Sequence, residues 1–411
     1  MQKLVKRVLP GELRSDPRPA LDGGRPIRSR LLAFARPELG REEEEAVIEV
    51  LRSGWLGTGP RVAALERAFA ARVGTAHAVA TTSWTAGMHL LLRAFGIGPG
   101  DEVVIPAITF PATMNAVLHA GARPVLADVH PERLTLDPKS VAAAITPRTR
   151  ALLPVHLYGW PCAMDEMRAL ARQYGLALLE DAAQAAGATY GGRSAGSLGD
   201  AASFSFYVTK NITTGEGGMI TTDRGDLVER LRIERLHGVD LDASRRSGLD
   251  YAHWEAISLG WKYNMGDLAA AIGLAQLAKL PRFVERRRAL DARYRRLLAQ
   301  VPVFTPVVGP REAETAAHLF PVLVHPGALR IDRDTLLKAL LAENVGVGVH
   351  FRALPSHRHV RDTLGVGPEA VPVASEASDR LLSLPLHTLM SDDDQDDVVE
   401  TLLRIARYYA A

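Results

Sequence analysis

The sequence predicts an α/β protein with a large domain built on a mostly parallel sheet, followed by a small C-terminal α+β domain. Two observations support this fold class. Short apolar runs alternate with helical stretches, which is typical of a parallel sheet with helical crossovers. Most of these runs lack alternating polar residues, as expected for strands that are covered on both faces. The length of 411 residues allows two domains.

The predicted large domain spans 31–280. Its first helix begins at Arg41 and is ended by the turn-forming segment 55–60. Strands are predicted at 78–82, 102–105, 124–128, 151–156, 176–181, 201–207 and 219–222. Helices are predicted between them at 85–95, 109–119, 138–145 and 163–174. Because parallel sheets bind ligands beyond the carboxyl ends of their strands, polar residues at those ends are candidates for a site.

The predicted small domain spans 281–411. A long charged helix is expected to begin at Pro281 and to mark the domain boundary. Residues 1–30 contain Pro, Gly and Arg with little periodicity, and we expect them to form an extended arm that packs on a partner subunit. The remaining elements of the small domain are predicted as strands at 319–325 and 345–350 and helices at 334–343 and 392–410.

Composition and charge exclude several classes of protein. Hydrophobic residues make up 47% of the chain and charged residues 23%, which favours neither a disordered nor a fibrous protein. The net charge of +2 gives no reason to expect binding to nucleic acid or to a membrane surface. We expect no signal peptide and no membrane span, because no long apolar run is present. The single cysteine, Cys162, excludes a disulfide framework and an iron–sulfur cluster, and predicts a cytoplasmic protein.

Two reactive side chains follow neighbouring predicted strands. The run 176–181 ends in two carboxylates, the second being Asp181, and the run 201–207 is followed by Lys210 among small residues. Each has an ordinary explanation, since Asp181 could cap a helix over 182–186 and most lysines are surface residues. Together they suit pyridoxal 5'-phosphate (PLP). This cofactor needs an amine to hold its aldehyde and an acid to keep its ring nitrogen protonated.

A phosphate site should accompany such a pair. Residues 81–87, with three Thr and one Ser, lie where a predicted strand turns into a helix. Free backbone N–H groups and hydroxyls at a helix start bind anions, although plain helix capping would use the same residues.

Several motifs occur in one order along the chain, at 54–60 (GWLGTGP), 98–103 (GPGDEV), 154–159 (PVHLYG), 180–184 (EDAAQ), 196–200 (GSLGD), 210–218 (KNITTGEGG) and 383–386 (SLPL). On these motifs the chain resembles the DegT/StrS family of sugar aminotransferases from about Leu32 to the C-terminus. Members of that family are PLP enzymes of fold type I, the aspartate-aminotransferase-like fold. The resemblance therefore implies this fold, the PLP cofactor and transamination.

The resemblance also implies roles around the cofactor ring. Lys210 would carry PLP covalently and move the proton between the substrate and the cofactor. Asp181 would pair with the ring nitrogen, and Gln184 would lie beside the phenolic oxygen. Phe110 would stack on the ring, although core packing would also explain an aromatic residue there.

For the phosphate, the resemblance implies Trp84, Thr85 and Ser205. Trp84 stands where the family usually has Gly or Ala, so we expect its large side chain to point toward the substrate. A segment of the neighbouring subunit would complete the phosphate site, with Lys262 and Asn264 at positions where this sequence departs from the family pattern. The resemblance thus implies a homodimer with shared active sites.

The implied substrates are glutamate, as amino donor, and a keto sugar nucleotide. Thr58, His237 and His350 would contact the sugar nucleotide, although a lone histidine is more often structural. Residues 346–357 and 85–89 look most like the C4 aminotransferases that form 4-amino-4-deoxy-arabinose.

Two alternatives stay open. Residues 20–28 resemble the leading arm of members that aminate keto cyclitols. A PLP-binding regulatory protein is a further alternative, although no DNA-binding module or basic face is evident in the sequence.

Overall fold

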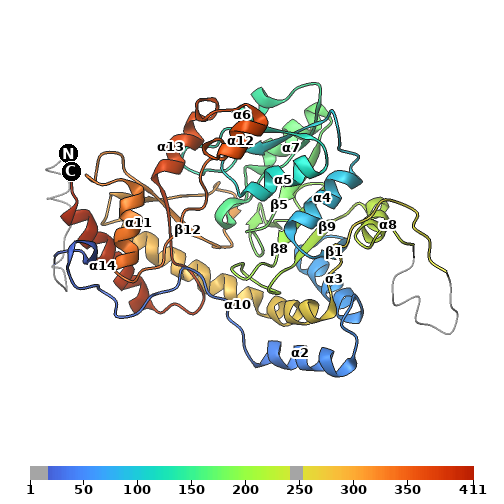
Figure 1. Cartoon of the computed structure of the whole chain (residues 1–411), viewed down its shortest axis with the longest axis horizontal. Helices are drawn as coiled ribbons and strands as arrows, with labels where there is room; N and C mark the ends of the chain where they lie inside the picture. The colour runs from blue at the N-terminus through green and yellow to red at the C-terminus, as the bar shows by residue number, and fades with distance from the viewer. Residues whose placement is uncertain (1–16, 241–252) are drawn as a thin grey trace.

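The computed structural model describes residues 17–240 and 253–411 (Figure 1). Its main sheet has seven strands in the order β1-β9-β8-β5-β4-β2-β3. Strand β9 is antiparallel to both of its neighbours, and the other pairs are parallel. The predicted α/β fold with a large, mostly parallel sheet is therefore confirmed. The strands are β1 (His77–Thr81), β2 (Glu102–Pro106), β3 (Arg123–Ala127), β4 (Thr149–Leu152), β5 (Ala177–Asp181), β8 (Ala201–Ser205) and β9 (Gly218–Thr222).

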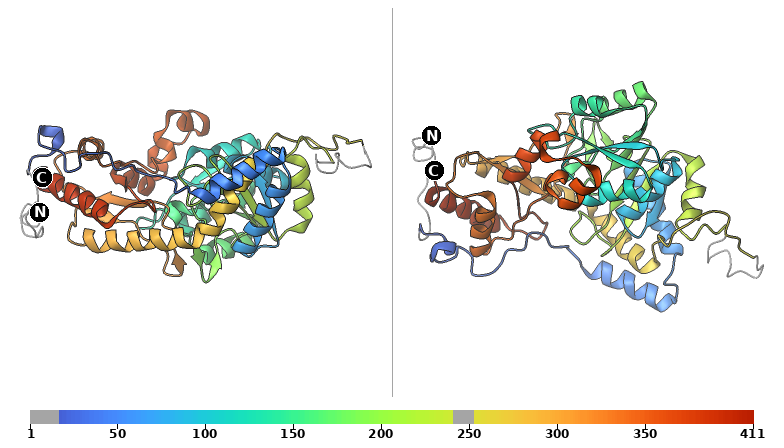
Figure 2. Two further views of the ribbon diagram at one scale, coloured as in Figure 1. Left: turned by 90° about the horizontal axis from the view of Figure 1, so that it is seen from below. Right: turned by 45° about the horizontal axis from the view of Figure 1, so that its top comes forward.

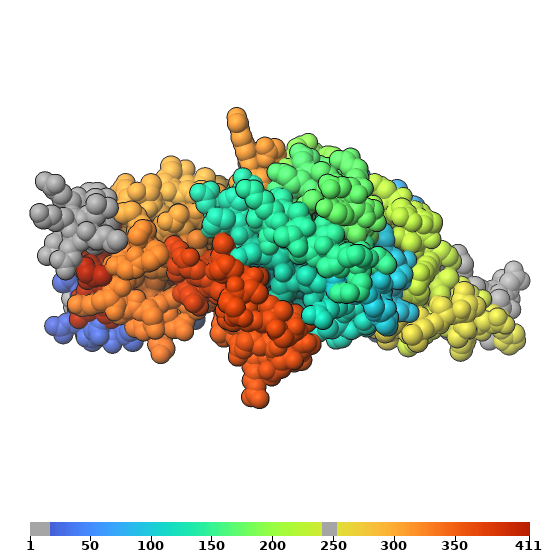
Figure 3. Space-filling model, turned by 90° about the horizontal axis from the view of Figure 1, so that it is seen from above, coloured from blue at the N-terminus to red at the C-terminus, as the bar shows by residue number. Residues whose placement is uncertain are grey.

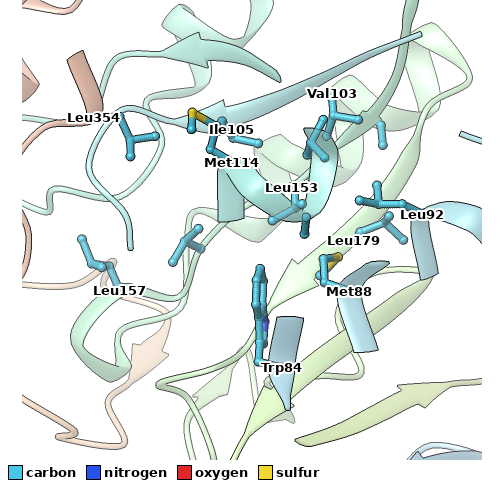
Figure 4. Close-up of a cluster of buried hydrophobic side chains, with 14 of the residues drawn as sticks. Trp84, Met88, Leu92, Val103, Ile105, Met114, Leu153, Leu157, Leu179 and Leu354 are labelled. Atoms are coloured by element: carbon cyan, nitrogen blue, oxygen red, sulfur yellow. The ribbon is translucent and has the colours of Figure 1, made fainter. Parts of the chain in front are cut away.

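Helices cover both faces of the main sheet. Successive side chains of a strand point to opposite faces, so each strand packs against helices on both sides. In β2, Val103 and Ile105 pack in one cluster with α4 and α5, whereas Val104 packs in another with α6 and α7. Figure 4 shows the first cluster, with Met88 of α4 beside Leu179 of β5. The flanking helices are α4 (Trp84–Ala94), α5 (Pro111–His119), α6 (Pro138–Ala144), α7 (Met164–Tyr174) and α8 (Gly225–Glu234).

The longest helix, α10 (Asp267–Leu298), extends from the main sheet to the small sheet (Figures 1 and 2). The prediction that it begins at Pro281 is wrong, because Pro281 lies inside it. An interior proline costs a helix about 3 kcal/mol. Packing against α2 (Arg41–Ser53) and α3 (Pro60–Val73) offsets this cost, since the first half of α10 is rich in Ala and Leu and buries them there.

The C-terminal part contains a second, antiparallel sheet in the order β10-β12-β13. Its core includes side chains of α11 and α14 (Figure 1). These elements are β10 (Phe304–Pro306), β12 (Phe320–Val324), β13 (Leu381–Leu384), α11 (Arg333–Ala342) and α14 (Asp392–Tyr408). A third, small sheet joins β11 (Ala313–Glu314), β6 (Thr189–Tyr190) and β7 (Arg193–Ser194).

The predicted strand at 345–350 does not form. This segment makes two isolated bridges, from Val345 to Leu32 and from Gly348 to Ser383. Apolar residues do alternate along this segment, but two glycines in six residues weaken a strand. Its bridge partners, Leu32 and Ser383, belong to different parts of the chain and do not form one neighbouring strand.

Two segments connect the parts of the molecule. Helices α12 (Arg358–Leu364) and α13 (Pro372–Arg380) follow the small-domain boundary in sequence but share a core cluster with the main sheet. Figure 3 shows this orange-red segment against the blue-green part of the large domain. The described part of the N-terminal arm, 17–30, contacts residues near α11 and α14 of its own chain. That the arm also packs on a partner subunit stays a prediction. The domain boundaries stay a prediction.

Candidate active site

A cavity of about 390 Å³ lies where β5 and β8 end. It is the edge at which a parallel sheet is expected to bind a ligand. The cavity brings together most of the cofactor residues predicted from the sequence, drawn from separate strands, loops and helix starts. Those lining it are Trp84, Thr85, Phe110, Asp181, Gln184, Ser205 and Lys210, together with His350 from the predicted substrate contacts.

Asp181 is the last residue of β5 and is only 4% exposed. Its Oδ1 accepts a hydrogen bond from the backbone N–H of Ala183 (3.1 Å) and its Oδ2 accepts one from the hydroxyl of Thr113 (3.0 Å). Burial raises the pKa of this carboxyl to about 6, although both hydrogen bonds and the charge of Lys210 lower it. A buried carboxylate with unused acceptor capacity suits a protonated ring nitrogen. No helix follows over 182–186, so the capping alternative does not apply.

Glu180, the neighbouring carboxylate, points away from the cavity and is fully buried. It accepts hydrogen bonds from the backbone N–H groups of Gly196, Leu198 and Gly199, each at 2.7 Å. Its Oε2 also lies 2.8 Å from Nε2 of His156. Glu180 thus fixes the loop before β8, and the pair of carboxylates divides into one structural group and one that faces the site.

Lys210 lies in a turn after β8, where its backbone N–H donates to the carbonyl of Tyr207 (2.9 Å). The side chain enters the cavity from the protein interior. Burial lowers the pKa of its amine to about 8, and the negative charge of Asp181 opposes that shift. An amine with this pKa is neutral in a much larger fraction near pH 7 than an ordinary lysine, which makes it a better nucleophile.

The start of α4 supplies anion-binding groups. Ser83 caps this helix by accepting a hydrogen bond from Ala86 N–H (3.1 Å), and Thr85 lines the cavity. Gly218 of β9 passes so close that a Cβ there would lie 2.7 Å from the backbone nitrogen of Trp84. Free N–H groups of a first helical turn and the hydroxyls of Thr85 and Ser205 can therefore bind a phosphate group.

The expectation that the Trp84 side chain points toward the substrate is not met. The residue lines the cavity, but its side chain is 5% exposed and packs in the core cluster (Figure 4). An indole buries a large apolar area, and the adjoining core of α4 and β5 accommodates it. Its Nε1 is buried without a hydrogen-bond partner among the described residues.

Gln184 is buried, whereas Phe110 is exposed. The Oε1 of Gln184 accepts a hydrogen bond from Tyr158 N–H (2.5 Å), which leaves the amide N–H groups as donors in a residue that lines the cavity. Phe110, directly before α5, is 58% exposed, which is unusual for a phenyl ring and excludes ordinary core packing.

Lys262 and Asn264, predicted to serve a partner subunit, and Thr58, a predicted substrate contact, do not line this cavity. Thr58 and Asn264 line a second cavity of about 420 Å³, where Asn264 Nδ2 donates to the Thr58 hydroxyl (2.7 Å). Lys262 is exposed and lines neither cavity. In the described part of the chain, these residues are therefore separate from Lys210.

The two predicted histidine contacts differ. His350 lines the first cavity, and burial, followed by the charge of Lys210, lowers the pKa of its imidazole to about 4. His237 is exposed with a left-handed φ of 60° and lines neither cavity.

Several residues that the sequence analysis does not name also line the cavity, among them Phe34, Thr113 and His318. Thr113 lies in the first turn of α5, and its hydroxyl is 2.7 Å from that of Thr109 in the loop after β2. His318 Nδ1 lies 3.2 Å from Oδ1 of Asn211, the residue after Lys210. Phe34 carries no local signal, since it comes from an irregular segment far away in sequence.

Neither a metal centre nor a membrane segment emerges from the structure. Over 17–240 and 253–411, no three His, Cys, Asp or Glu side chains are grouped so that they could hold a metal ion. Among the same residues, no helix is long and apolar enough to span a bilayer.

Known proteins resemble this chain over most of its length. The model of the DegT/DnrJ/EryC1/StrS aminotransferase family matches residues 37–403. The spore coat polysaccharide biosynthesis protein SpsC of Bacillus subtilis (strain 168) is 44% identical over 383 residues, which cover 92% of this chain and 98% of SpsC.

Two solved structures extend the likeness to the fold. The putative sugar aminotransferase Spr1654 from Streptococcus pneumoniae in its PMP form has a TM-score of 0.86 at 30% identity, covering 92% of this chain and 99% of that chain. The crystal structure of DesI in the presence of its TDP-sugar product has a TM-score of 0.83 at 36% identity, covering 93% of this chain and 95% of that chain. The chain belongs to the DegT/DnrJ/EryC1/StrS aminotransferase family and is a PLP-dependent sugar aminotransferase.

Proposed function

We propose that the enzyme transfers an amino group from glutamate to the C4 ketone of a keto sugar nucleotide in the cytoplasm. The observation that carries the proposal is the cavity that joins Asp181 and Lys210 to the aromatic residues near His350. DesI, whose structure contains a TDP-sugar product, supports a nucleotide-linked acceptor. The likeness of 346–357 to C4 aminotransferases supports the ketone position. Cys162, a buried free thiol, is compatible with a reducing compartment.

The residues of the cavity fit the cofactor. Lys210 would hold its aldehyde carbon, Asp181 its ring nitrogen and the start of α4 its phosphate. Phe110 is the exposed ring that can stack on the pyridine face, and Gln184 offers an amide N–H to the phenolic oxygen. When bound, PLP supplies an electron sink for the charge that develops at the amino-bearing carbon.

Two side chains of this protein, Lys210 and Asp181, control where protons are held during the reaction. Lys210 Nζ, neutral in a substantial fraction near pH 7, can accept the proton from the amino-bearing carbon of the donor and return it to the acceptor carbon. Asp181, held by Thr113 and Ala183, stabilises a proton on the ring nitrogen because its charge lies in a dry site. Both roles recur in each half of a two-step transfer.

A homodimer with shared sites is part of the proposal. Lys262 and Asn264, which the family resemblance assigns to the neighbouring subunit's site, lie outside the cavity of their own chain, as a shared site requires. Mixing inactive Lys210→Ala and impaired Asn264→Ala enzymes would create one intact site in each hybrid dimer. We expect activity above the sum of the two variants, and no gain would contradict shared sites.

Absorbance of the purified enzyme tests the donor half of the proposal. Glutamate should convert the band of bound PLP to that of the amino form, and 2-oxoglutarate should reverse this change. The loaded enzyme is then mixed with either TDP-4-keto-6-deoxyglucose or the keto cyclitol scyllo-inosose. Turnover of the first supports the nucleotide-linked acceptor, whereas turnover of the second alone would establish the cyclitol alternative suggested by residues 20–28.

A further inference from the structure

Four aromatic side chains form a row along one side of the cavity, and we call them the aromatic wall: Phe110, Phe351, His350 and Phe34. Their ring centroids are 5.5 Å apart between Phe110 and Phe351, 5.3 Å between Phe351 and His350, and 4.8 Å between His350 and Phe34. The last two rings are stacked with only 10° between their planes. The wall thus leads from the predicted cofactor position to Phe34, which belongs to no helix or strand.

We propose that Phe34 is a specificity-determining residue, against which the ring of the acceptor packs. The inference rests on the proposed function and names the part of the site that separates the two substrates. A sugar or cyclitol ring presents C–H groups to the negative face of an aromatic ring. Glutamate has no ring to pack against an aromatic face.

The backbone around Phe34 is fixed by three hydrogen bonds. Leu32 N–H donates to Asn344 O (2.9 Å), Gly346 N–H donates to Leu32 O (2.9 Å), and Leu386 N–H donates to Phe34 O (3.3 Å). A Cβ on Gly346 would lie 2.7 Å from the Phe34 nitrogen, so the two segments are in close contact. Phe34 and the segment that carries His350 are therefore held as one unit.

The N-terminal arm contacts this unit through Glu343 and Asn344. Glu343 and Arg404 form an ion pair whose side chains are both fully buried, with 3.0 Å between Oε2 and Nη1. Glu343 also accepts hydrogen bonds from the backbone N–H groups of Ala20 and Ile27, each at 2.8 Å. Asn344 Nδ2 donates to the carbonyl of Arg28 (2.8 Å).

These contacts join the arm to the two residues that precede Val345, where the pairing with Leu32 begins. Both carboxylate oxygens of Glu343 accept hydrogen bonds from the arm as well as from Arg404, which favours one arrangement of these segments over others. The described part of the arm, 17–30, precedes the span matched by the family model, lines no part of the cavity, and therefore acts on Phe34 and His350 through these backbone contacts.

The two half-reactions of the PLP-loaded enzyme can be followed separately by absorbance. We expect Phe34→Ala to lower kcat/KM for TDP-4-keto-6-deoxyglucose about 10-fold, since one aromatic contact is lost. The glutamate half-reaction should stay within about 2-fold of wild type. Phe34→Tyr keeps the ring and should recover most of the loss. Tyr174→Ala, at an exposed tyrosine that ends α7, is the matched control.

Equal losses in both half-reactions, or no loss in Phe34→Ala, would overturn the assignment of Phe34. Failure of the wild-type enzyme to aminate either TDP-4-keto-6-deoxyglucose or scyllo-inosose is a different result, because it contradicts the proposed function itself. With an enzyme that accepts only scyllo-inosose, the same comparison of Phe34 variants is made on that ketone.

The arm is tested by Asn344→Gly. Asn344 has a left-handed φ of 60°, so glycine keeps the backbone and removes only the side-chain bond to Arg28. We expect the acceptor KM to rise about 3-fold while the KM for glutamate is unchanged, because loss of this hydrogen bond loosens only the segment that carries His350. A proportional rise of both KM values would show a general structural role and overturn the positioning role of the arm.

Discussion

The floor and the aromatic wall of the cavity are built in different ways. The floor groups Asp181 and Lys210 follow two neighbouring strands of the main sheet. The wall residues Phe34 and His350 come from irregular segments joined by an isolated bridge. A rigid sheet suits chemistry that both substrates share, whereas loop-like segments can differ between relatives without disturbing it. Variants of the floor should therefore impair both half-reactions, and variants of the wall only one.

The largest effect is expected from Lys210→Ala. Loss of the amine removes both the covalent link to PLP and the proton carrier, so steady-state transamination should fall below detection. The far-UV circular dichroism should match wild type, because the side chain enters a cavity and supports no packing. Turnover near the wild-type rate would refute the role of Lys210. Lys338→Ala, at an exposed lysine of α11, should leave activity unchanged.

Asp181→Asn should lower kcat/KM for both substrates by about 100-fold or more, since a preorganised charge beside the ring nitrogen is lost. The amide keeps the size and shape of the carboxyl, so the variant should still bind some PLP. Stopped-flow absorbance of each half-reaction measures the effect. A loss confined to the acceptor half-reaction would break the distinction between floor and wall. Asp362→Asn, on the exposed face of α12, is the control.

The pH dependence of cofactor loading tests the environment of Lys210. Only the neutral amine attacks the PLP aldehyde, and burial lowers its pKa to about 8. The rate of covalent loading of the apoprotein should therefore rise about 10-fold per pH unit below pH 8 and level off above it. Absorbance after rapid mixing measures this rate. A continued rise toward pH 10 would mean that Lys210 titrates as an ordinary exposed lysine.

How far the sequence predicts each region follows from the same contrast. Asp181, Lys210 and the start of α4 are predictable, because polar groups that follow apolar strands have few places to go other than the sheet edge. Trp84 is not, since only the three-dimensional packing of α4 on β5 shows that there is room for an indole.

Phe34 is the least predictable. Its contact with His350 joins residues more than 300 positions apart through one isolated bridge, Leu32 to Val345, and a close glycine contact, neither of which has a periodic pattern. The prediction for the start of α10 is wrong for a related reason. Pro281 favours a helix start locally, but packing of α10 on α2 and α3 outweighs that preference.

The smallest effect is expected from Gly348→Ala, which disturbs the wall without removing any ring. A Cβ at this position would lie 2.7 Å from Cε1 of His350, so the imidazole must move. It cannot move freely, because it is stacked on Phe34. We expect kcat/KM for the ketone acceptor to fall about 3- to 5-fold, less than the loss from Phe34→Ala, as the aromatic contact is weakened and not abolished.

Combining Gly348→Ala with Phe34→Ala tests whether both substitutions act through the contact between His350 and Phe34. Without the phenyl ring, the displaced imidazole has space, so the second substitution should add little to the first, and a double-mutant cycle on kcat/KM measures this coupling. Strictly additive losses would mean that the glycine acts on His350 independently of Phe34. The glutamate half-reaction should be unaffected in all three variants, because the floor groups Asp181 and Lys210 lie on elements that these substitutions do not touch.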